Sequence, residues 1–203
     1  MSYKLKQIGA SVAVLDAAGG FSDTYGSAVQ PATSGSVTVD HVAFGPFVQT
    51  TIRLDNVSQS VVNGTEYQGT KIFSFPQSRM YVVGATATLQ QKTTSTIAST
   101  INSGSTGAIG VGTATASATT LATTMQDIIP TTAFTSSTTI NVAGTAVSAV
   151  LASPAVFDGT GTAKDLYLNT AYATTTDVDG NGTQTISGVV RVTWINLGDL
   201  PAV

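Results

Sequence analysis

The sequence predicts an all-β protein, built as an antiparallel β-sandwich of jelly-roll-like type. Three observations carry this prediction. Runs rich in Val, Ile, Thr and aromatic residues alternate apolar and polar side chains, which is the period of a strand with one buried face. Turn-forming Gly, Pro, Asn and Asp residues separate these runs at intervals of about 8–15 residues. No fixed-period repeat indicates a solenoid or a propeller.

The first 35 residues differ in composition from the rest. Residues 1–35 contain clusters of Gly, Ser, Ala and Pro, and we expect an N-terminal extended arm and loop there. Residues 8–15 are a short apolar run, which predicts a first strand or an arm that adds to a neighbour's sheet. Two lysines before this run resemble a secretory leader, but Asp16 ends the run early. We therefore expect no cleaved signal peptide.

Residues 36–203 are expected to form one β-sandwich domain, and its strands follow in order. Alternating runs predict strands over 36–44, 50–57, 71–76, 81–89, 138–142, 165–172 and 184–196. The last of these is the longest. Asn63-Gly64 is a tight-turn dipeptide, because both central residues of a type I′ turn need positive φ. Gly84 predicts a bulge or bend within its strand.

The middle of the chain is less regular. Residues 92–130 are expected as a Ser/Thr-rich insertion with one short helix near 114–129. Leu121, Met125, Ile128 and Ile129 recur at helical spacing, and Pro130 ends the pattern. The glycine-rich stretch before it, at residues 107–112, lacks the spacing of a phosphate loop and is interpreted as a flexible surface loop.

Composition excludes several function classes. Charged residues make up only 9% of the 203, with a formal net charge of -3, so a nucleic-acid partner is not expected. No apolar run approaches the roughly 18 residues of a membrane span, so no membrane is expected either. The chain has no cysteine, one glutamate and one histidine. Because so few titratable groups are available, we expect no enzymatic activity. A weakly charged, Thr-rich surface suits a protein covered by other subunits.

One loop resembles a calcium site. Asp177, Asp179 and Asn181 alternate as oxygen ligands, and Gly182 follows them. A complete calcium loop carries a glutamate at its twelfth position, where this chain has Gly188. The alternative, and the favoured interpretation, is a plain tight turn between strands. No cofactor is therefore expected, and calcium at this loop is the one alternative left open.

Two other groups of residues invite a functional interpretation. His41 is expected to be a partly buried, hydrogen-bonded side chain, because no second histidine completes a metal site. The large aromatic residues are expected mainly to fill the core, with a sugar-stacking platform as the alternative. They are Phe44, Phe47, Phe73, Phe75, Tyr81, Tyr167, Tyr172 and Trp194.

Two stretches carry a resemblance to a known family. One is 69–76 (GTKIFSFP) with 81–87 (YVVGATA), and the other is 179–183 (DGNGT) with 188–199 (GVVRVTWINLGD). They resemble virion structural proteins of tailed bacteriophages, of the capsid cement or decoration type. The resemblance implies a subunit made in the host cytoplasm and placed on the capsid exterior. It also implies the major capsid protein as a partner, and it transfers no site residues. The role of residues 92–120 stays open, because this stretch carries no resemblance.

The expected function is therefore structural: binding the outside of a phage capsid and stabilising contacts between capsomers. The same subunit is expected to associate with itself as a dimer or trimer. Two alternatives remain. One is another virion component, such as a head fibre, tail or receptor-binding subunit. The other is a secreted carbohydrate-binding or adhesin domain that uses the aromatic residues and the Asp177 loop.

Overall fold

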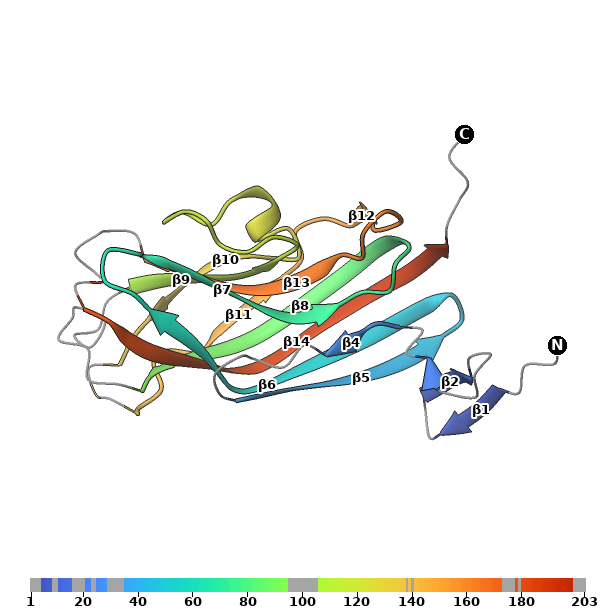
Figure 1. The fold of residues 1–203 in the computed structure, drawn as a ribbon, viewed down its shortest axis with the longest axis horizontal. Coiled ribbons are helices and arrows are strands. Elements are labelled where there is room, and N and C mark those ends of the chain that lie inside the picture. The colour runs from blue at the N-terminus through green and yellow to red at the C-terminus, as the bar shows by residue number, and fades with distance from the viewer. Residues whose placement is uncertain are drawn as a thin grey trace.

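A computed structural model describes residues 5–8, 11–15, 21–22, 25–28, 35–94, 106–137, 139, 141–172, 178 and 180–198. These residues form antiparallel sheets, with no α-helix among them. The all-β class is thereby confirmed. Figure 1 shows the long strands of the two main sheets running along the length of the molecule. The jelly-roll connectivity of the strands stays a prediction.

The larger sheet has six strands in the order β11-β8-β14-β6-β5, and β12 also pairs with β8. Its strands are β5 (Ser36–Phe44), β6 (Phe47–Val61), β8 (Arg79–Thr93), β11 (Val147–Val150), β12 (Ala155–Asp158) and β14 (Gly182–Gly198). The C-terminal β14 lies in the middle, between β6 and β8, and its residues alternate between the core side and the outer side from Val190 to Ile195.

The second sheet has five strands in the order β10-β9-β13-β7-β4. They are β4 (Ser27–Ala28), β7 (Tyr67–Ser74), β9 (Thr106–Gly112), β10 (Ile129–Thr135) and β13 (Asp165–Tyr172). Nearer the N-terminus, β1 (Leu5–Ile8), β2 (Ser11–Leu15) and β3 (Phe21–Ser22) form a small separate sheet. Figure 1 shows β1 and β2 at one end of the molecule, near β5.

One apolar core lies between the two large sheets. It takes Ile52, Leu89 and Trp194 from the six-stranded sheet and Phe73 and Leu166 from the other. Each of these side chains is almost fully buried, which is the expected consequence of period-two alternation on both sheets. The edge-to-face contacts of Phe73 with Phe75, and of Phe75 with Trp194, fill the space between the layers.

A buried polar layer closes one end of this core. Gln184 donates from Nε2 to Gln59 Oε1 at 3.1 Å, and Tyr172 donates its hydroxyl to Gln184 Oε1 at 2.7 Å. Thr170 donates to Gln59 Oε1 at 2.7 Å. Because Gln59 and Gln184 belong to the six-stranded sheet and Thr170 and Tyr172 to β13, the bonds from Thr170 and Tyr172 join the two layers directly. Such satisfied buried bonds fix how one sheet sits on the other.

Most expected strands are present. Residues 36–44 and 165–172 form strands with the predicted bounds, and the runs at 50–57, 71–76, 81–89 and 184–196 lie within or overlap β6, β7, β8 and β14. The bulge expected near Gly84 is confirmed. Thr193 pairs with Gly84 while Trp194 pairs with Val82, so one residue of β8 is skipped.

The prediction of a short helix near 114–129 is wrong. The segment holds only the single 3-10 turn η2 (Thr123–Met125). Its apolar residues go to two different places: Leu121 and Met125 pack on the outside of the five-stranded sheet, whereas Ile128 and Ile129 enter the main core. A helix presents one stripe to one surface, so it cannot serve both.

Two smaller expectations also fail. No strand forms over 138–142 in its described residues, because Asn141 has a φ of 62° and turns the chain. The glycine-rich stretch is not a surface loop: Gly107, Gly110 and Gly112 lie in β9, between β10 and β13. A Cβ at Gly107 would meet the Phe134 ring at 2.5 Å, so the glycines allow close packing and not flexibility.

Candidate docking surface on the six-stranded sheet

The outer faces of the two large sheets differ. A loop at residues 113–128, here the 113–128 loop, covers the outer face of the five-stranded sheet. Its Ala116 and Leu121 pack with Ala171 of β13, and Tyr67 and Met125 flank them. No comparable cluster covers the outer face of the six-stranded sheet among the described residues. Among the described residues, that face is therefore the less covered of the two.

Asn169 holds the 113–128 loop in place. Its Oδ1 accepts from Ala116 N at 2.8 Å, and its Nδ2 donates to Ala114 O at 2.9 Å and Met125 O at 2.8 Å. Gly69 lies opposite Asn169 on β7, and a Cβ there would collide with Thr115 Oγ1. The side-chain pattern of β13 gave no sign of this role, since an asparagine within a strand is not by itself informative.

An apolar row crosses the open face near one end. It consists of Phe44, Phe47, Ile195, Tyr81 and Val156, on β5, β6, β14, β8 and β12 in that order. Each is the cross-strand partner of the next, so all five side chains lie on one face. The rings of Phe44 and Phe47 stack with centroids 5.6 Å apart. Phe44 is 49% exposed and Val156 58%, so the row is open to solvent.

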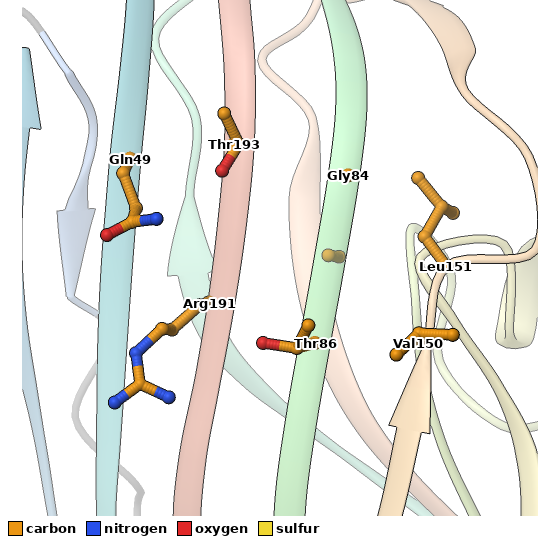
Figure 2. Close-up of a pocket in the computed structure, with 8 residues that line it drawn as sticks. Gln49, Gly84, Thr86, Val150, Leu151, Arg191 and Thr193 are labelled. Carbon is orange, nitrogen blue, oxygen red and sulfur yellow. The ribbon is translucent and has the colours of Figure 1, made fainter. Parts of the chain in front are cut away.

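A recess of about 300 Å³ lies further along the same face, here the Arg191 recess. It is lined by Gln49, Gly84, Ala85, Thr86, Val150, Leu151, Arg191 and Thr193. Figure 2 shows the side chain of Arg191 leaning from β14 toward β6, with Gln49 on that side and Thr86 on the other. Val150 and Leu151 lie beyond Thr86 and form an apolar side.

The recess exists because of the local sequence. Thr193 pairs with Gly84 on one side and with Gln49 on the other, so three strands distant in sequence meet there. At Gly84 no side chain rises from the sheet, and a Cβ would have open space around it. The bulge next to Gly84 adds local twist. Sequence reasoning did not single out Arg191, whose neighbours become visible only from the strand register.

Charges on this face are sparse. Arg53 pairs with Asp40 across β6 and β5, with Arg53 Nε 3.6 Å from Asp40 Oδ2. Both side chains are largely exposed, so this ion pair contributes little to stability. Threonines occupy much of the remaining face, among them Thr38, Thr51 and Thr86. Hydroxyls of this kind bind a partner without the cost of burying ions.

His41 has the expected environment. It is partly buried, and its Nδ1 lies 3.0 Å from Thr50 Oγ1. Its ring lies against Tyr25 and Phe73, with centroid separations of 5.7 and 6.0 Å. Thr50 also accepts a hydrogen bond from Trp194 Nε1 at 2.9 Å. The histidine is thus part of the packing between β5 and the core.

The predicted calcium ligands are only partly visible. Asp177 and Asp179 lie outside the described residues. Asn181 Oδ1 accepts from Asn63 N at 2.7 Å, and Gly64 N donates to Val178 O at 3.2 Å. The Asn181 amide oxygen thus ties the Asn63-Gly64 turn to the 178–181 segment. The plain turn stays the prediction for this loop, and calcium binding by Asp177, Asp179 and Asn181 stays its open alternative.

The aromatic residues divide between core and surface. Phe73, Phe75, Tyr172 and Trp194 are buried, as expected of core residues. Phe44, Phe47 and Tyr81 lie instead in the apolar row, and Tyr167 is partly buried on β13. Within the described ranges no cluster of three or more His, Asp or Glu side chains is placed to hold a metal ion. Nor does any described helix have the length and apolarity to cross a bilayer.

Comparison with known proteins does not assign the chain to a family. No family model matches it, and a search of curated proteins found no significant match.

Proposed function

We propose that this chain is a structural virion protein that binds the outside of a phage capsid and stabilises contacts between capsomers. The observation that carries the proposal is the open outer face of the six-stranded sheet. Its apolar row crosses five strands, and its surroundings are rich in threonine. A contiguous exposed apolar patch with a polar surround is typical of a protein–protein contact.

The second support is the resemblance of 69–76 with 81–87, and of 179–183 with 188–199, to tailed-phage cement and decoration proteins. Those stretches include most of β7, part of β8 and most of β14, which belong to the two large sheets. In this proposal the major capsid protein is the partner. The subunit associates with itself as a dimer or trimer, stays on the capsid exterior and catalyses no reaction.

Binding of the purified protein to empty capsid shells tests the proposal. A cement role predicts a stoichiometry set by shell symmetry and a higher melting temperature of the shells, by linkage. Phe44→Ser is expected to weaken this binding and to leave the fold intact, because Phe44 is half exposed. Val62→Ser is the matched control: Val62 is also half exposed but lies in the turn after β6, away from the apolar row. Absence of binding, or equal loss in both variants, would contradict the proposal.

Copy number separates this function from its nearest alternative. A head-fibre, tail or receptor-binding subunit is present in a few copies per particle, whereas a cement subunit covers the shell. Quantitative mass spectrometry of purified particles distinguishes them. A count far below the number of capsomers would replace the cement role with the fibre or tail role.

A further inference from the structure

Arg191 carries a charge that no carboxylate among the described residues balances. The other two arginines each face a carboxylate: Arg53 lies 3.6 Å from Asp40, and Arg79 lies 3.3 Å from Asp158. Arg191 makes no ion pair within the described part of the chain, and its cross-strand neighbours are Thr51 and Thr86. Its side chain is exposed at the Arg191 recess.

The other groups around Arg191 add hydrogen bonding and shape. Gln49 offers an amide N–H₂, and Thr86 and Thr193 offer hydroxyls, all of which donate hydrogen bonds. Val150, 62% exposed, and Leu151 provide an apolar side. The recess thus combines one planar guanidinium, neutral donors and an aliphatic surface.

We propose that the Arg191 recess binds an acidic side chain, aspartate or glutamate, of a partner protein. The guanidinium fork matches a carboxylate in a bidentate pair. The recess is about one cross-strand row, roughly 7 Å, from the apolar row, so one partner surface reaches both.

The charge balance favours a carboxylate over a nucleic-acid phosphate. Binding a phosphate backbone requires several lysines or arginines side by side. Among the described residues that line the recess, Arg191 is the only cation. Arg53 is paired with Asp40, and the whole chain has a net charge of -3. A single guanidinium with neutral donors fits one carboxylate.

The partner assignment rests on the proposed function, so one test uses capsid shells. We expect Arg191→Gln to weaken shell binding about ten- to a hundredfold, the value of a charge-assisted hydrogen bond, and to reduce its salt dependence. Arg191→Lys should retain part of the affinity. Arg53→Gln, on the same face, is the matched control and should bind nearly as wild type. Gly84→Val should also weaken binding, because it fills the recess without removing the charge, and its Cβ has open space.

A second test needs no shells. We would titrate the ¹⁵N-labelled protein with N-acetylglutamate N-methylamide and follow the side-chain Nε–H resonances of the arginines. We expect a saturable shift at Arg191 and little at Arg53, with no saturation by the glutamine analogue. Inorganic phosphate should bind more weakly. No saturable shift, or stronger binding of phosphate, would overturn the proposal. If the probe binds at Arg191 but the wild-type protein does not bind shells, the carboxylate site is supported and the proposed capsid function is contradicted.

Discussion

Thr50 links the packing of two rings near the centre of the six-stranded sheet. Its hydroxyl accepts from the Trp194 indole N–H at 2.9 Å and lies 3.0 Å from His41 Nδ1. Both Thr50 and Trp194 are fully buried. A buried donor without a partner costs much more than the net value of the bond it loses. This one hydroxyl therefore matters more than most of the chain's many threonines.

Replacing this hydroxyl is expected to destabilise the protein. Thr50→Val keeps the shape but leaves the Trp194 N–H unsatisfied, so we expect the free energy of unfolding to fall by about 1–3 kcal/mol. Thr51→Val is the control: Thr51 is the next residue on β6 and lies on the outer face, so its effect should stay within about 0.5 kcal/mol. Urea unfolding followed by tryptophan fluorescence measures both. Equal effects at 50 and 51 would refute the role of the hydroxyl.

The titrations of Asp127 and Asp158 are expected to change the stability of the protein with pH in opposite directions. Burial raises the pKa of Asp127 above 3.8, although its bonds from Thr113 oppose the shift. Because the folded state then holds the proton more tightly, the stability contribution of Asp127 is present below pH 3.8 and is lost as pH rises through the raised pKa. Bonds from Thr160, and then Arg79, lower the pKa of exposed Asp158 to about 2. Its contribution is present above pH 3.8 and is lost as pH falls toward 2.

Thermal unfolding at a series of pH values tests both signs. The melting temperature of the wild type relative to Asp158→Asn should be highest near neutral pH and should converge near pH 2. The difference in melting temperature between the wild type and Asp127→Asn should be largest in acid and should decline as pH rises above 4. Parallel curves for either pair would mean that the titration of that aspartate is not coupled to folding.

At the scale of elements, the 113–128 loop takes the place of a helix on the five-stranded sheet. Its ends meet through Ala114 N to Thr124 O at 2.9 Å and Ile128 N to Val111 O at 3.1 Å. Thr113 donates from N and Oγ1 to the two oxygens of Asp127, at 2.8 and 2.6 Å. The loop then packs Leu121 and Ala116 onto Ala171. Compact loops of this kind, with ends close together, pack through their own side chains.

Asn169 is expected to be the residue on which this loop depends. Asn169→Ala removes three hydrogen bonds, which leaves the buried Ala116 N–H and the partly buried carbonyls of Ala114 and Met125 without this partner. We therefore expect a loss of about 3 kcal/mol in the free energy of unfolding. Asn196→Ala, which removes one exposed local bond to Gly198, is the control. Urea unfolding gives the energies, and limited proteolysis between 113 and 128 shows whether the loop is released. A resistant loop in Asn169→Ala would contradict this interpretation.

For the molecule as a whole, the outer faces of the two large sheets differ in how much the described chain covers them. One outer face is covered by the chain's own loop, and the other stays open with the apolar row and the Arg191 recess. β5 is an edge strand of the open sheet and pairs only with β6 among the described strands. Its outer edge offers backbone groups to an added strand. In the proposed assembly, the N-terminal arm of a neighbour supplies that strand.

Deleting residues 1–15 tests this arrangement. We expect the truncated chain to fold with nearly unchanged stability, because β1 and β2 pair within the small β1-β2-β3 sheet and not with a strand of either large sheet. Its attachment to shells should weaken, because main-chain bonds between subunits and the resulting avidity are lost. Sedimentation with empty shells measures attachment, and thermal unfolding of the free subunit measures folding. Equal binding by truncated and intact protein would exclude the arm from assembly.

The sequence by itself determined the all-β class and the strands at 36–44 and 165–172, because alternation along a strand is a local property of the residues. It also determined the bulge near Gly84 and the partly buried state of His41. The tertiary structure decided the rest. Leu121, Met125, Ile128 and Ile129 keep the spacing of a helix, yet burial on opposite faces of one sheet outweighs that weak local preference. The Arg191 recess likewise depends on the pairing of β14 with β6 and β8. Only the register of these three strands brings Gln49, Gly84 and Arg191 together.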